Sequence, residues 1–496
     1  MKIRILLTLL SYFAYLHCRA QQVTFKESLG GNLPDYGYSV IQAYDKGYVA
    51  AGSTASFSYG NSDVYVIKTD SNGTLKWSKH FGSPNIEVGR CVEELKDSSL
   101  IIVGFTNNVN ANGYDVYLLH LDSQGDSLWA KTYGGTGWDF AYAVHQTIDG
   151  GFIIAGGTYS YGSGGEDCWL IKTDISGDTL WTKTYGGDMD DEARSVRQTS
   201  DSGFVLTGTT KSFGDTSGDV YIVKTTKTGD TLWTRTYGRK FEEDGTDIIE
   251  CKNHDFAVCG RAYDDSGLKT ASTYLLRTQN NGQYKWSVYY YNDTVHYSSL
   301  ESIIEIPNGN LFSAGITDKY GQGAKDGFLL ITTDVGQFIN GYTYGTAEDD
   351  GWYSVTPTKD KGYIFCGYTD STNLGFGEQN LCIQKTDSNG LTPFIPFLLS
   401  THTFKSNALY VNIYPNPFNT NTHILINSVD KISPSNFSLK TMDITGRNCS
   451  ANYRIVSANN NSIELQLNRN DLQQGIYFIQ FYQNSQQVGT SKVIIE

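Results

Sequence analysis

The sequence predicts an all-β protein, a seven-bladed β-propeller followed by a small C-terminal β-sandwich. Three observations lead to this fold class: an internal repeat of about 52 residues, short apolar segments separated by Gly and Asp, and a composition with 35 Tyr and 52 Gly in 496 residues. Aromatic and β-branched side chains fit a pleated sheet, and Gly supplies the positive φ of tight turns. No long segment has the 3.6-residue period of a helix.

Large aromatic residues mark the repeat along the chain. Successive marks lie about 52 residues apart, and eight of them enclose seven units. We expect each ring to fill the gap between two adjacent blades. The marks are Phe25, Trp77, Trp129, Trp181, Trp233, Trp286, Phe338 and Phe394.

Each unit has the pattern of four short strands. In the third unit the strands are expected at residues 143–146, 152–156, 167–172 and 179–183, with turns at 149–151 and 176–178. Four short strands with Gly and Asp at the reversals are typical of one propeller blade. Repetition around an axis leaves only short, protected sheet edges.

The ends of the repeat predict how the ring closes. Residues 23–30 resemble a fourth strand without a blade of its own, so we expect them to pair into the seventh blade. Around Phe394 the pattern is interrupted by Pro393 and Pro396, and the chain is expected to leave the ring there. The predicted propeller spans residues 21–398.

The first twenty residues have the features of a cleaved signal peptide. Lys2 and Arg4 precede an apolar stretch from Ile5 to Leu16, which is too short to span a bilayer, and cleavage is expected near Ala20. A lipid anchor at Cys18 is the alternative. Elsewhere no 18-residue apolar run occurs, so no transmembrane segment is expected.

Charge and cysteine content narrow the function classes. The formal net charge of −14 disfavours nucleic acid as a partner and favours solubility outside the cell. The eight cysteines form no CxxC pair and no Cys/His cluster with zinc spacing, which argues against a disulfide framework. A bridge between Cys251 and Cys259 is the one alternative.

Acidic residues recur once per unit, before the first strand of each blade. Two interpretations stay open: a ring near one mouth of the central channel that gathers calcium or a cationic ligand, or carboxylates that accept N–H bonds from their own turns. The sequence does not identify a metal, and no cofactor is expected apart from calcium at this ring. The positions are Asp35, Glu87, Asp139, Asp191, Glu243 and Asp350, with Ser298 in the sixth unit.

A second polar series lies on the third strands. Lys68, Lys172, Lys224 and Lys385 recur at one position, five residues after an Asp in most units. We expect a solvated strand face there.

Catalytic motifs are missing from the sequence. It contains no GxSxG, no HExxH and no Ser/His/Asp order of a triad. Acidic residues at 190–192, 242–244 and 348–350 leave a paired-carboxylate glycosidase open. The sequence therefore favours a non-catalytic protein over an enzyme.

Tyrosine-rich loops predict a binding surface. Tyr pairs an apolar face with a polar hydroxyl, which suits sugars and proteins alike. The candidate contacts are Tyr159, Tyr161, Gly162, Gly164 and Tyr289 to Tyr291. The expected function is binding of an extracellular glycan, envelope component or protein. An extracellular hydrolase or lyase acting on a polysaccharide, and a structural surface-layer component, are the alternatives.

The run from Ile67 to Trp77 (IKTDSNGTLKW) carries a resemblance. It is similar to the blade signature of quinoprotein-like (delta-60-like) β-propellers, in which an Asp, a Gly turn and a docking Trp end the blade. The vicinal cysteines that stack on the cofactor of quinoprotein dehydrogenases are absent here, so no quinone cofactor is expected.

The repeat stops before the tail. A linker is expected at residues 399–409 and a separate small β-sandwich at 410–496. Strand patterns occur at 411–418, 439–447, 463–467, 475–481 and 487–495.

Three motifs in the tail carry a second resemblance: YPNPF, D-x-x-G-R and L-x-x-G-x-Y, followed by a terminal strand with a basic residue. Together they resemble the type A C-terminal sorting domain of the type IX secretion system of Bacteroidetes-type bacteria. The matching positions are Tyr414, Pro415, Asn416, Pro417, Asp443, Gly446, Arg447, Gly475, Tyr477 and Lys492. Glu496 departs from the family, which usually ends in a basic residue.

The resemblance implies partners and a location. Such a domain guides its cargo across the outer membrane, where a sortase-like processing enzyme removes it and often links the cargo to lipopolysaccharide. The type IX secretion machinery and that enzyme are therefore the expected partners. The protein is expected to be secreted or attached to the outer membrane.

Overall fold

The computed structural model describes most of the chain and divides it into two units, Met1–Leu399 and Ser400–Glu496. The described residues are 23–107, 113–264, 270–290, 296–321, 323–370, 379–391, 397–398, 409–414, 418–428, 436–443, 447–449, 452–458, 462–469, 472–483 and 486–495. The predicted signal peptide and Phe394 lie outside them.

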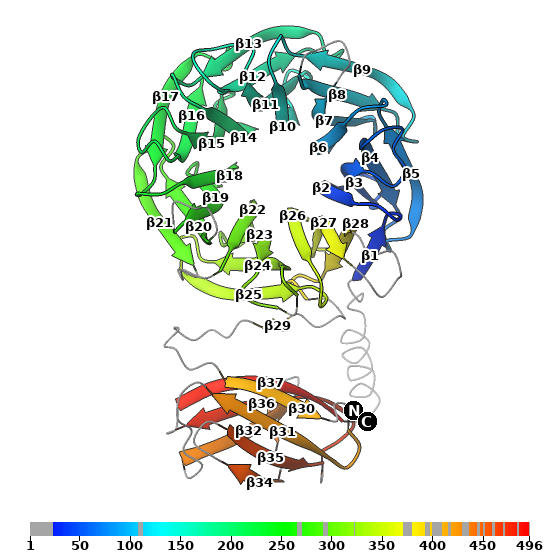
Figure 1. Ribbon diagram of the computed structural model, residues 1–496, viewed down its shortest axis with the longest axis vertical. Coiled ribbons are helices and arrows are strands. Elements are labelled where there is room, and N and C mark those ends of the chain that lie inside the picture. The colour runs from blue at the N-terminus through cyan, green and yellow to red at the C-terminus, as the bar shows by residue number, and fades with distance from the viewer. Residues whose placement is uncertain are drawn as a thin grey trace, which may run out of the picture. The chain divides into compact units, whose positions relative to one another are not determined.

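The first unit is a ring of antiparallel sheets around a central opening (Figure 1). Its described residues form seven sheets, and in all but the last the strand nearest the axis comes first in the chain order of the blade. The first three blades consist of β2 (Asp35–Gln42), β3 (Tyr48–Thr54), β4 (Asp63–Thr69) and β5 (Leu75–Phe81); β6 (Glu87–Glu94), β7 (Leu100–Thr106), β8 (Asp115–Leu121) and β9 (Ser127–Tyr133); and β10 (Asp139–Gln146), β11 (Phe152–Thr158), β12 (Asp167–Thr173) and β13 (Thr179–Tyr185).

The remaining blades repeat this arrangement, and the propeller predicted from the sequence is confirmed. They consist of β14 (Asp191–Gln198), β15 (Phe204–Thr210), β16 (Asp219–Thr225) and β17 (Thr231–Tyr237); β18 (Glu243–Glu250), β19 (Phe256–Tyr263), β20 (Ala271–Thr278) and β21 (Tyr284–Tyr290); β22 (Ser298–Glu305), β23 (Leu311–Thr317), β24 (Asp326–Thr332) and β25 (Phe338–Tyr344); and β26 (Asp350–Pro357), β27 (Tyr363–Asp370) and β28 (Gln379–Thr386).

The N-terminal strand completes the last blade. β1 (Phe25–Leu29) pairs antiparallel with β28, with Phe25 opposite Lys385, so the expected closure of the ring is confirmed. The other end behaves differently from the expectation. β29 (Phe397–Leu398) adds a fifth strand to the sixth blade by pairing with β25, so the chain returns to the propeller beyond Phe394.

The hydrophobic core lies between neighbouring blades. One cluster joins Ile153 and Leu170 of the third blade to Phe204 and Val223 of the fourth, all nearly inaccessible to solvent. The inner strands approach closely, because a Cβ on Gly156 would lie 1.8 Å from the carbonyl oxygen of Phe140. The same close approach recurs at Gly52, Gly104, Gly208, Gly260, Gly315 and Gly367, so every second strand needs Gly at this position.

Most of the aromatic marks dock on a glycine turn of the next blade. The half-buried ring of Trp181 lies against Gly229, where an added Cβ would come within 2.7 Å of it, and Gly229 has a φ of +78°. Only Gly combines this backbone with so close a ring. The same contact joins Phe25 to Gly73, Trp77 to Gly125, Trp129 to Gly177, Trp233 to Gly282 and Trp286 to Gly336. Phe338 instead packs beside Tyr290 of the preceding blade.

A tyrosine latch that the sequence analysis missed accompanies these rings. The hydroxyl of Tyr185, four residues after Trp181, donates to the carbonyl oxygen of Gly229 at 2.6 Å. The signal was a Tyr at a fixed distance from the mark. The same bond joins Tyr133 to Gly177, Tyr237 to Gly282, Tyr290 to Gly336 and Tyr344 to Gly390.

One sequence expectation about the blades is wrong, and one alternative does not hold. Lys172 does not face solvent but is buried, with its Nζ 3.0 Å from Asp149 Oδ1 in the turn of its own blade; Lys68, Lys224 and Lys385 are buried in the same way. The described cysteines are all free. Cys251 contacts the Arg277 guanidinium at 2.8 Å instead of bonding to Cys259.

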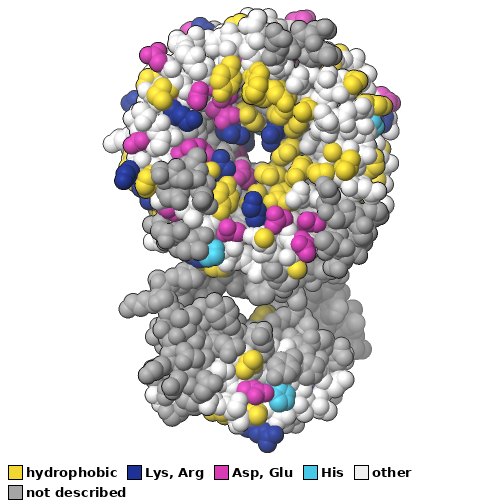
Figure 2. All heavy atoms as spheres, viewed as in Figure 1, with side chains coloured by type: hydrophobic (Ala, Val, Ile, Leu, Met, Phe, Trp, Pro, Cys, Tyr) yellow, Lys and Arg dark blue, Asp and Glu magenta, His cyan; other side chains and the backbone are white. Residues whose placement is uncertain are grey.

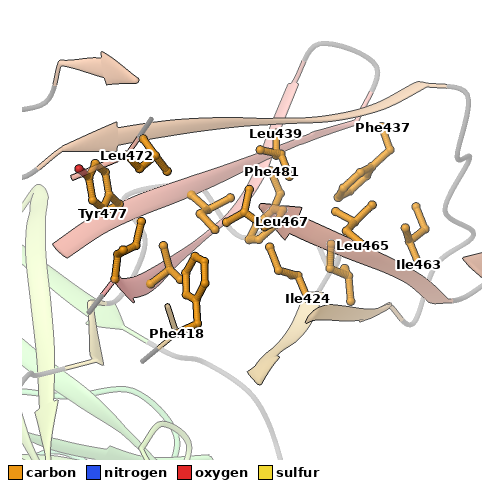
Figure 3. Packing of buried hydrophobic residues seen from close by; sticks show 14 residues of the cluster. Phe418, Ile424, Phe437, Leu439, Ile463, Leu465, Leu467, Leu472, Tyr477 and Phe481 are labelled. Atoms are coloured by element: carbon orange, nitrogen blue, oxygen red, sulfur yellow. The ribbon is translucent and has the colours of Figure 1, made fainter. Parts of the chain in front are cut away.

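The second unit consists of two four-stranded sheets with a shared apolar core (Figure 3). Alternation along the strands produces it: Ile463, Leu465 and Leu467 are fully buried while the residues between them are not. Its strands are β30 (Leu409–Tyr414), β31 (Asn421–Ser428), β35 (Ser462–Asn468) and β34 (Asn452–Ala458) in one sheet, and β33 (Asn448–Cys449), β32 (Phe437–Asp443), β36 (Gly475–Gln483) and β37 (Gln486–Ile495) in the other.

Candidate binding site at the channel mouth

The six acidic residues predicted as a channel ring begin the innermost strands, but their side chains are buried within the blades. Asp139 is inaccessible to solvent; its carboxylate accepts the Gly135 N–H at 2.9 Å and the Ser160 hydroxyl at 2.6 Å. Glu87 likewise accepts the Ser83 N–H at 2.8 Å and the Thr106 hydroxyl at 2.7 Å. Asp35, Asp191, Glu243 and Asp350 accept backbone N–H bonds in the same manner.

These contacts favour the turn-acceptor interpretation over an open cation ring. Within the part of the chain that the structure describes, no three His, Cys, Asp or Glu side chains group in a way that could hold a metal ion. Calcium binding stays a prediction from the sequence, and a melting temperature that calcium leaves unchanged would contradict it.

The channel itself is lined by a position that the sequence analysis missed. Three residues after each acidic mark, every first strand carries a β-bulge, where the pairing register shifts. A bulge leaves one residue unpaired and redirects its side chain. The bulged residues line a cavity of about 250 Å³ and form what we call the channel ring: Tyr38, Arg90, Tyr142, Arg194, Thr246, Glu301 and Tyr353. The signal was a position three residues after each strand start that is polar or aromatic in every unit.

Hydrophobic side chains gather on one side of the central opening (Figure 2), and two groups of aromatic rings lie in contact on the blades of β2, β6 and their neighbours. One group consists of Tyr36, Tyr38, Tyr353 and Tyr368, with ring centroids 5.2–6.1 Å apart. A second group consists of Phe105, Tyr114, Trp138 and Phe140, with centroids 5.1–6.4 Å apart. We call these eight residues the aromatic arc.

Trp138 gives the aromatic arc an accessible edge. Its side chain is 52% exposed although its ring packs edge-on against Tyr114 at 5.7 Å. A large ring held rigidly by neighbours and open to solvent is a low-entropy platform for a ligand.

Charged side chains occupy the other side of the mouth, over the blades of β10, β14 and β18. Two arginines are paired there: Arg194 Nε lies 2.8 Å from Glu192, and Arg261 Nε lies 2.6 Å from Asp244. The charged arc consists of Glu166, Asp190, Glu192, Arg194, Glu242, Asp244 and Arg261.

The carboxyl groups of the charged arc differ in pKa, because some are raised by burial and like charges and others are lowered by a nearby arginine. Burial and the nearby charge of Glu192 raise the pKa of Glu166 to about 8. Burial and the charge of Asp244 raise the pKa of Glu242 to about 7. Burial acts against ionisation of Asp244 too, but the Arg261 guanidinium holds its pKa below the usual value. Protonated and ionised carboxyls therefore lie side by side at neutral pH.

The tyrosines predicted as contacts do not form one site. Tyr159 and Tyr161, both about half exposed, lie in the loop between β11 and β12, beside the charged arc. The Tyr161 hydroxyl donates to the Gly134 carbonyl oxygen at 2.7 Å, and Gly162 and Gly164 follow in the same loop. Tyr289 lies on the outer strand β21 with the Arg239 guanidinium 3.6 Å above its ring, away from the channel; Tyr291 is outside the described residues.

The sorting motif residues fall in the second unit. Tyr414 ends β30, and Arg447 Nε donates to Asp443 Oδ2 at 3.0 Å. Tyr477 is buried in the core and donates to the Gln473 carbonyl oxygen at 2.9 Å. Gly475 begins β36, and Lys492 pairs with Phe478 in β37. Pro415, Asn416, Pro417 and Gly446 lie outside the described residues.

Comparison with solved structures finds remote likeness only. A protein of unknown function from Dyadobacter fermentans is 11% identical with a TM-score of 0.41, covering 74% of this chain and 98% of that one. The β-propeller domain of the trilobed protease from Pyrococcus furiosus is 9% identical with a TM-score of 0.39, covering 74% and 97%. Likeness at this level assigns no function. No curated protein matches the chain.

The tail has a clear family. Residues 412–496 match the model of the secretion system C-terminal sorting domain, which indicates secretion through the type IX system. Within the described segments, no helix has both the length and the apolar character that a membrane crossing requires. The chain therefore carries, behind an all-β propeller, a domain that belongs to the type IX C-terminal sorting family.

Proposed function

We propose that the protein is an exported, non-catalytic β-propeller that binds an extracellular glycan at the channel mouth. The observation that carries the proposal is the aromatic arc with Trp138 at its exposed edge, next to a cavity lined by polar channel-ring residues. Sugar rings present C–H faces that stack on aromatic side chains, and polar groups nearby fix their hydroxyls.

A binding assay with a matched pair of variants tests this proposal. The full chain is run through gels that contain single neutral or acidic polysaccharides, and retardation is measured. Trp138→Ala is expected to weaken retardation about tenfold with an unchanged melting temperature. Tyr284→Ala removes an equally exposed ring from the outer strand β21 and is expected to change nothing. Retention of full binding by Trp138→Ala would contradict the site.

Cleavage of the polymer is the second candidate function, and one observation favours it. Glycosidases use one protonated and one ionised carboxyl group, and in the charged arc the raised pKa of Glu242 lies beside the lowered pKa of Asp244. New reducing ends in the presence of the wild-type protein, lost in Glu242→Gln, would establish a hydrolase. Binding without new reducing ends supports the non-catalytic function.

Export and processing follow from the sorting domain. We propose that the predicted signal peptide at residues 1–20 delivers the chain to the periplasm, and that residues 410–496 then engage the type IX machinery and are removed by a sortase-like enzyme. Deletion of residues 410–496 is expected to leave the propeller inside the cell envelope. Unchanged recovery of the truncated protein from the culture medium would refute this assignment.

A further inference from the structure

Arg90 differs from the other arginines of the channel and its mouth in having no anionic partner. Arg194, Arg197 and Arg261 each lie within 2.6–2.9 Å of a carboxylate. Among the described residues no carboxylate lies within salt-bridge distance of Arg90, and its Nε is buried without a hydrogen-bond partner. A buried N–H without an acceptor is costly, because that donor has lost water without replacement.

The surroundings of Arg90 cover the face of its guanidinium but leave its edge without acceptors. The Tyr38 ring lies 4.2 Å from its Cζ, and the rings of Phe105 and Tyr142 lie 5.6 and 5.7 Å away. Cation–π contacts engage the flat face of the ion, whereas its N–H groups point outward in the plane. Arg90 thereby bridges the two groups of the aromatic arc and keeps the donors of a planar fork unused.

A planar fork of donors fits a carboxylate in two parallel hydrogen bonds. The aromatic rings on both sides of Arg90 fit the C–H face of a sugar. One ligand class combines the two features, an acidic sugar whose ring bears a carboxylate.

The rest of the channel ring limits where such a carboxylate can lie. Glu301 stands on the sixth blade, and Glu192 and Asp244 stand in the charged arc over the fourth and fifth. These carboxylates repel an anion, so only the side of the mouth near Arg90 accepts it. The cavity of about 250 Å³ is smaller than the ~300–1,000 Å³ of usual small-molecule sites, so it holds one terminal unit of a chain.

We propose that Arg90 binds the carboxylate of a uronic acid at the end of an acidic glycan, with that sugar ring stacked on the aromatic arc. This rests on the proposed glycan-binding function and specifies its substrate class. Arg90 is then a specificity residue, since it separates acidic from neutral chains.

Isothermal titration of the full chain tests the proposal. The probes are trimers of galacturonate, glucuronate and mannuronate, the methyl esters of the same trimers, and a peptide with a free C-terminal carboxylate. At least one acidic trimer is expected to bind ten times more tightly than its uncharged ester and than the peptide. Arg90→Gln is expected to weaken that binding at least tenfold, and Arg90→Lys to recover part of it.

Arg235→Gln is the matched control, because this exposed arginine also lies over an aromatic ring, 5.9 Å from Trp233, on the outer strand β17. It is expected to bind the acidic trimer like the wild type. Melting temperatures of all variants report folding. Arg90→Lys keeps the positive charge but not the planar pair of donors. If Arg90→Gln does not fold, weaker binding of the acidic trimer by Arg90→Lys tests the role of Arg90 instead.

Three results would overturn the proposal. Equal affinity for trimer and ester, with binding lost in Trp138→Ala, would leave the glycan-binding function standing and remove the role of Arg90. Tighter binding of the peptide would replace the sugar by a protein partner. Binding of no trimer and no ester would remove both this inference and glycan binding by these sugars.

Discussion

The outer strands and the channel of the propeller obey opposite rules. At the outside, six of the seven described aromatic marks rest on a glycine turn, four tyrosines latch these same turns and a fifth latches Gly390, so neighbouring blades repeat one contact. At the channel ring the seven blades present Tyr, Arg, Tyr, Arg, Thr, Glu and Tyr. Repetition therefore belongs to the joints between blades, and variation belongs to the surface that a ligand can reach.

Trp181→Ala should have the largest effect on stability. The half-buried ring fills a joint between the third and fourth blades, and its removal leaves a cavity, so the free energy of unfolding should fall by about 3 kcal/mol. Urea unfolding followed by tyrosine and tryptophan fluorescence measures this. Trp138→Ala, at the channel mouth, should change it by less than about 1 kcal/mol; comparable losses in both would erase the contrast between joint and mouth.

Asp191→Ala should follow. Its buried carboxylate accepts the Gly187 N–H at 2.8 Å and the Ser212 hydroxyl at 2.6 Å, and both donors would lose their acceptor, at a cost of about 2 kcal/mol. The exposed Asp188 nearby supplies the control variant Asp188→Ala, which should be neutral. If Asp191→Ala lowered the affinity for calcium but left the stability unchanged, the cation-site interpretation of this position would be favoured.

Tyr185→Phe isolates the latch. The change removes one hydroxyl that donates to the Gly229 carbonyl oxygen and leaves the ring, so a loss of about 1 kcal/mol is expected. Phe81 occupies the equivalent position of the first blade without a hydroxyl. Phe81→Tyr is therefore the reverse experiment, and a loss larger than that of Tyr185→Phe would show that the latch does not suit every joint.

Glu166→Gln differs from the variants above, because its effect on stability should appear only at high pH. The folded-state pKa of about 8 lies above the unfolded value, so the folded protein holds more protons and stability falls as pH rises from about 4.5 to 8. The neutral Gln removes this fall. Urea midpoints of wild type and variant should agree at pH 5 and diverge at pH 9 in favour of the variant, whereas exposed Glu348→Gln should show no divergence.

The sequence predicted the joints because they repeat. The marks from Trp77 to Trp286 recur at an almost constant spacing, and this period also predicted that the N-terminal strand pairs with the last blade. The burial of Lys172 was not predictable in this way, because its partner Asp149 lies 23 residues away in a turn that already had its own explanation.

The candidate site was predicted only in part. The innermost strands begin at Asp35 and its equivalents; in the third blade this is Asp139, four residues before the predicted start at 143. A carboxylate at a strand start can face the channel or its own turn, and only the fold decides. The channel ring escaped because a bulge turns Tyr38 or Arg90 against the two-residue alternation of a strand. A position that is polar or aromatic in every unit, three residues after each strand start, is the signal that could have found it.

The pairing of β1 with β28 also sets an order of events for biogenesis. Phe25, among the first residues behind the predicted leader, has its partner at Lys385, so the first strand waits for the last blade to be made. Until then β1 has no partner strand, and an unpaired strand is prone to wrong pairing. A chain that is truncated before the last blade cannot close the ring. Only a full-length propeller can therefore form the pairing of β1 with β28.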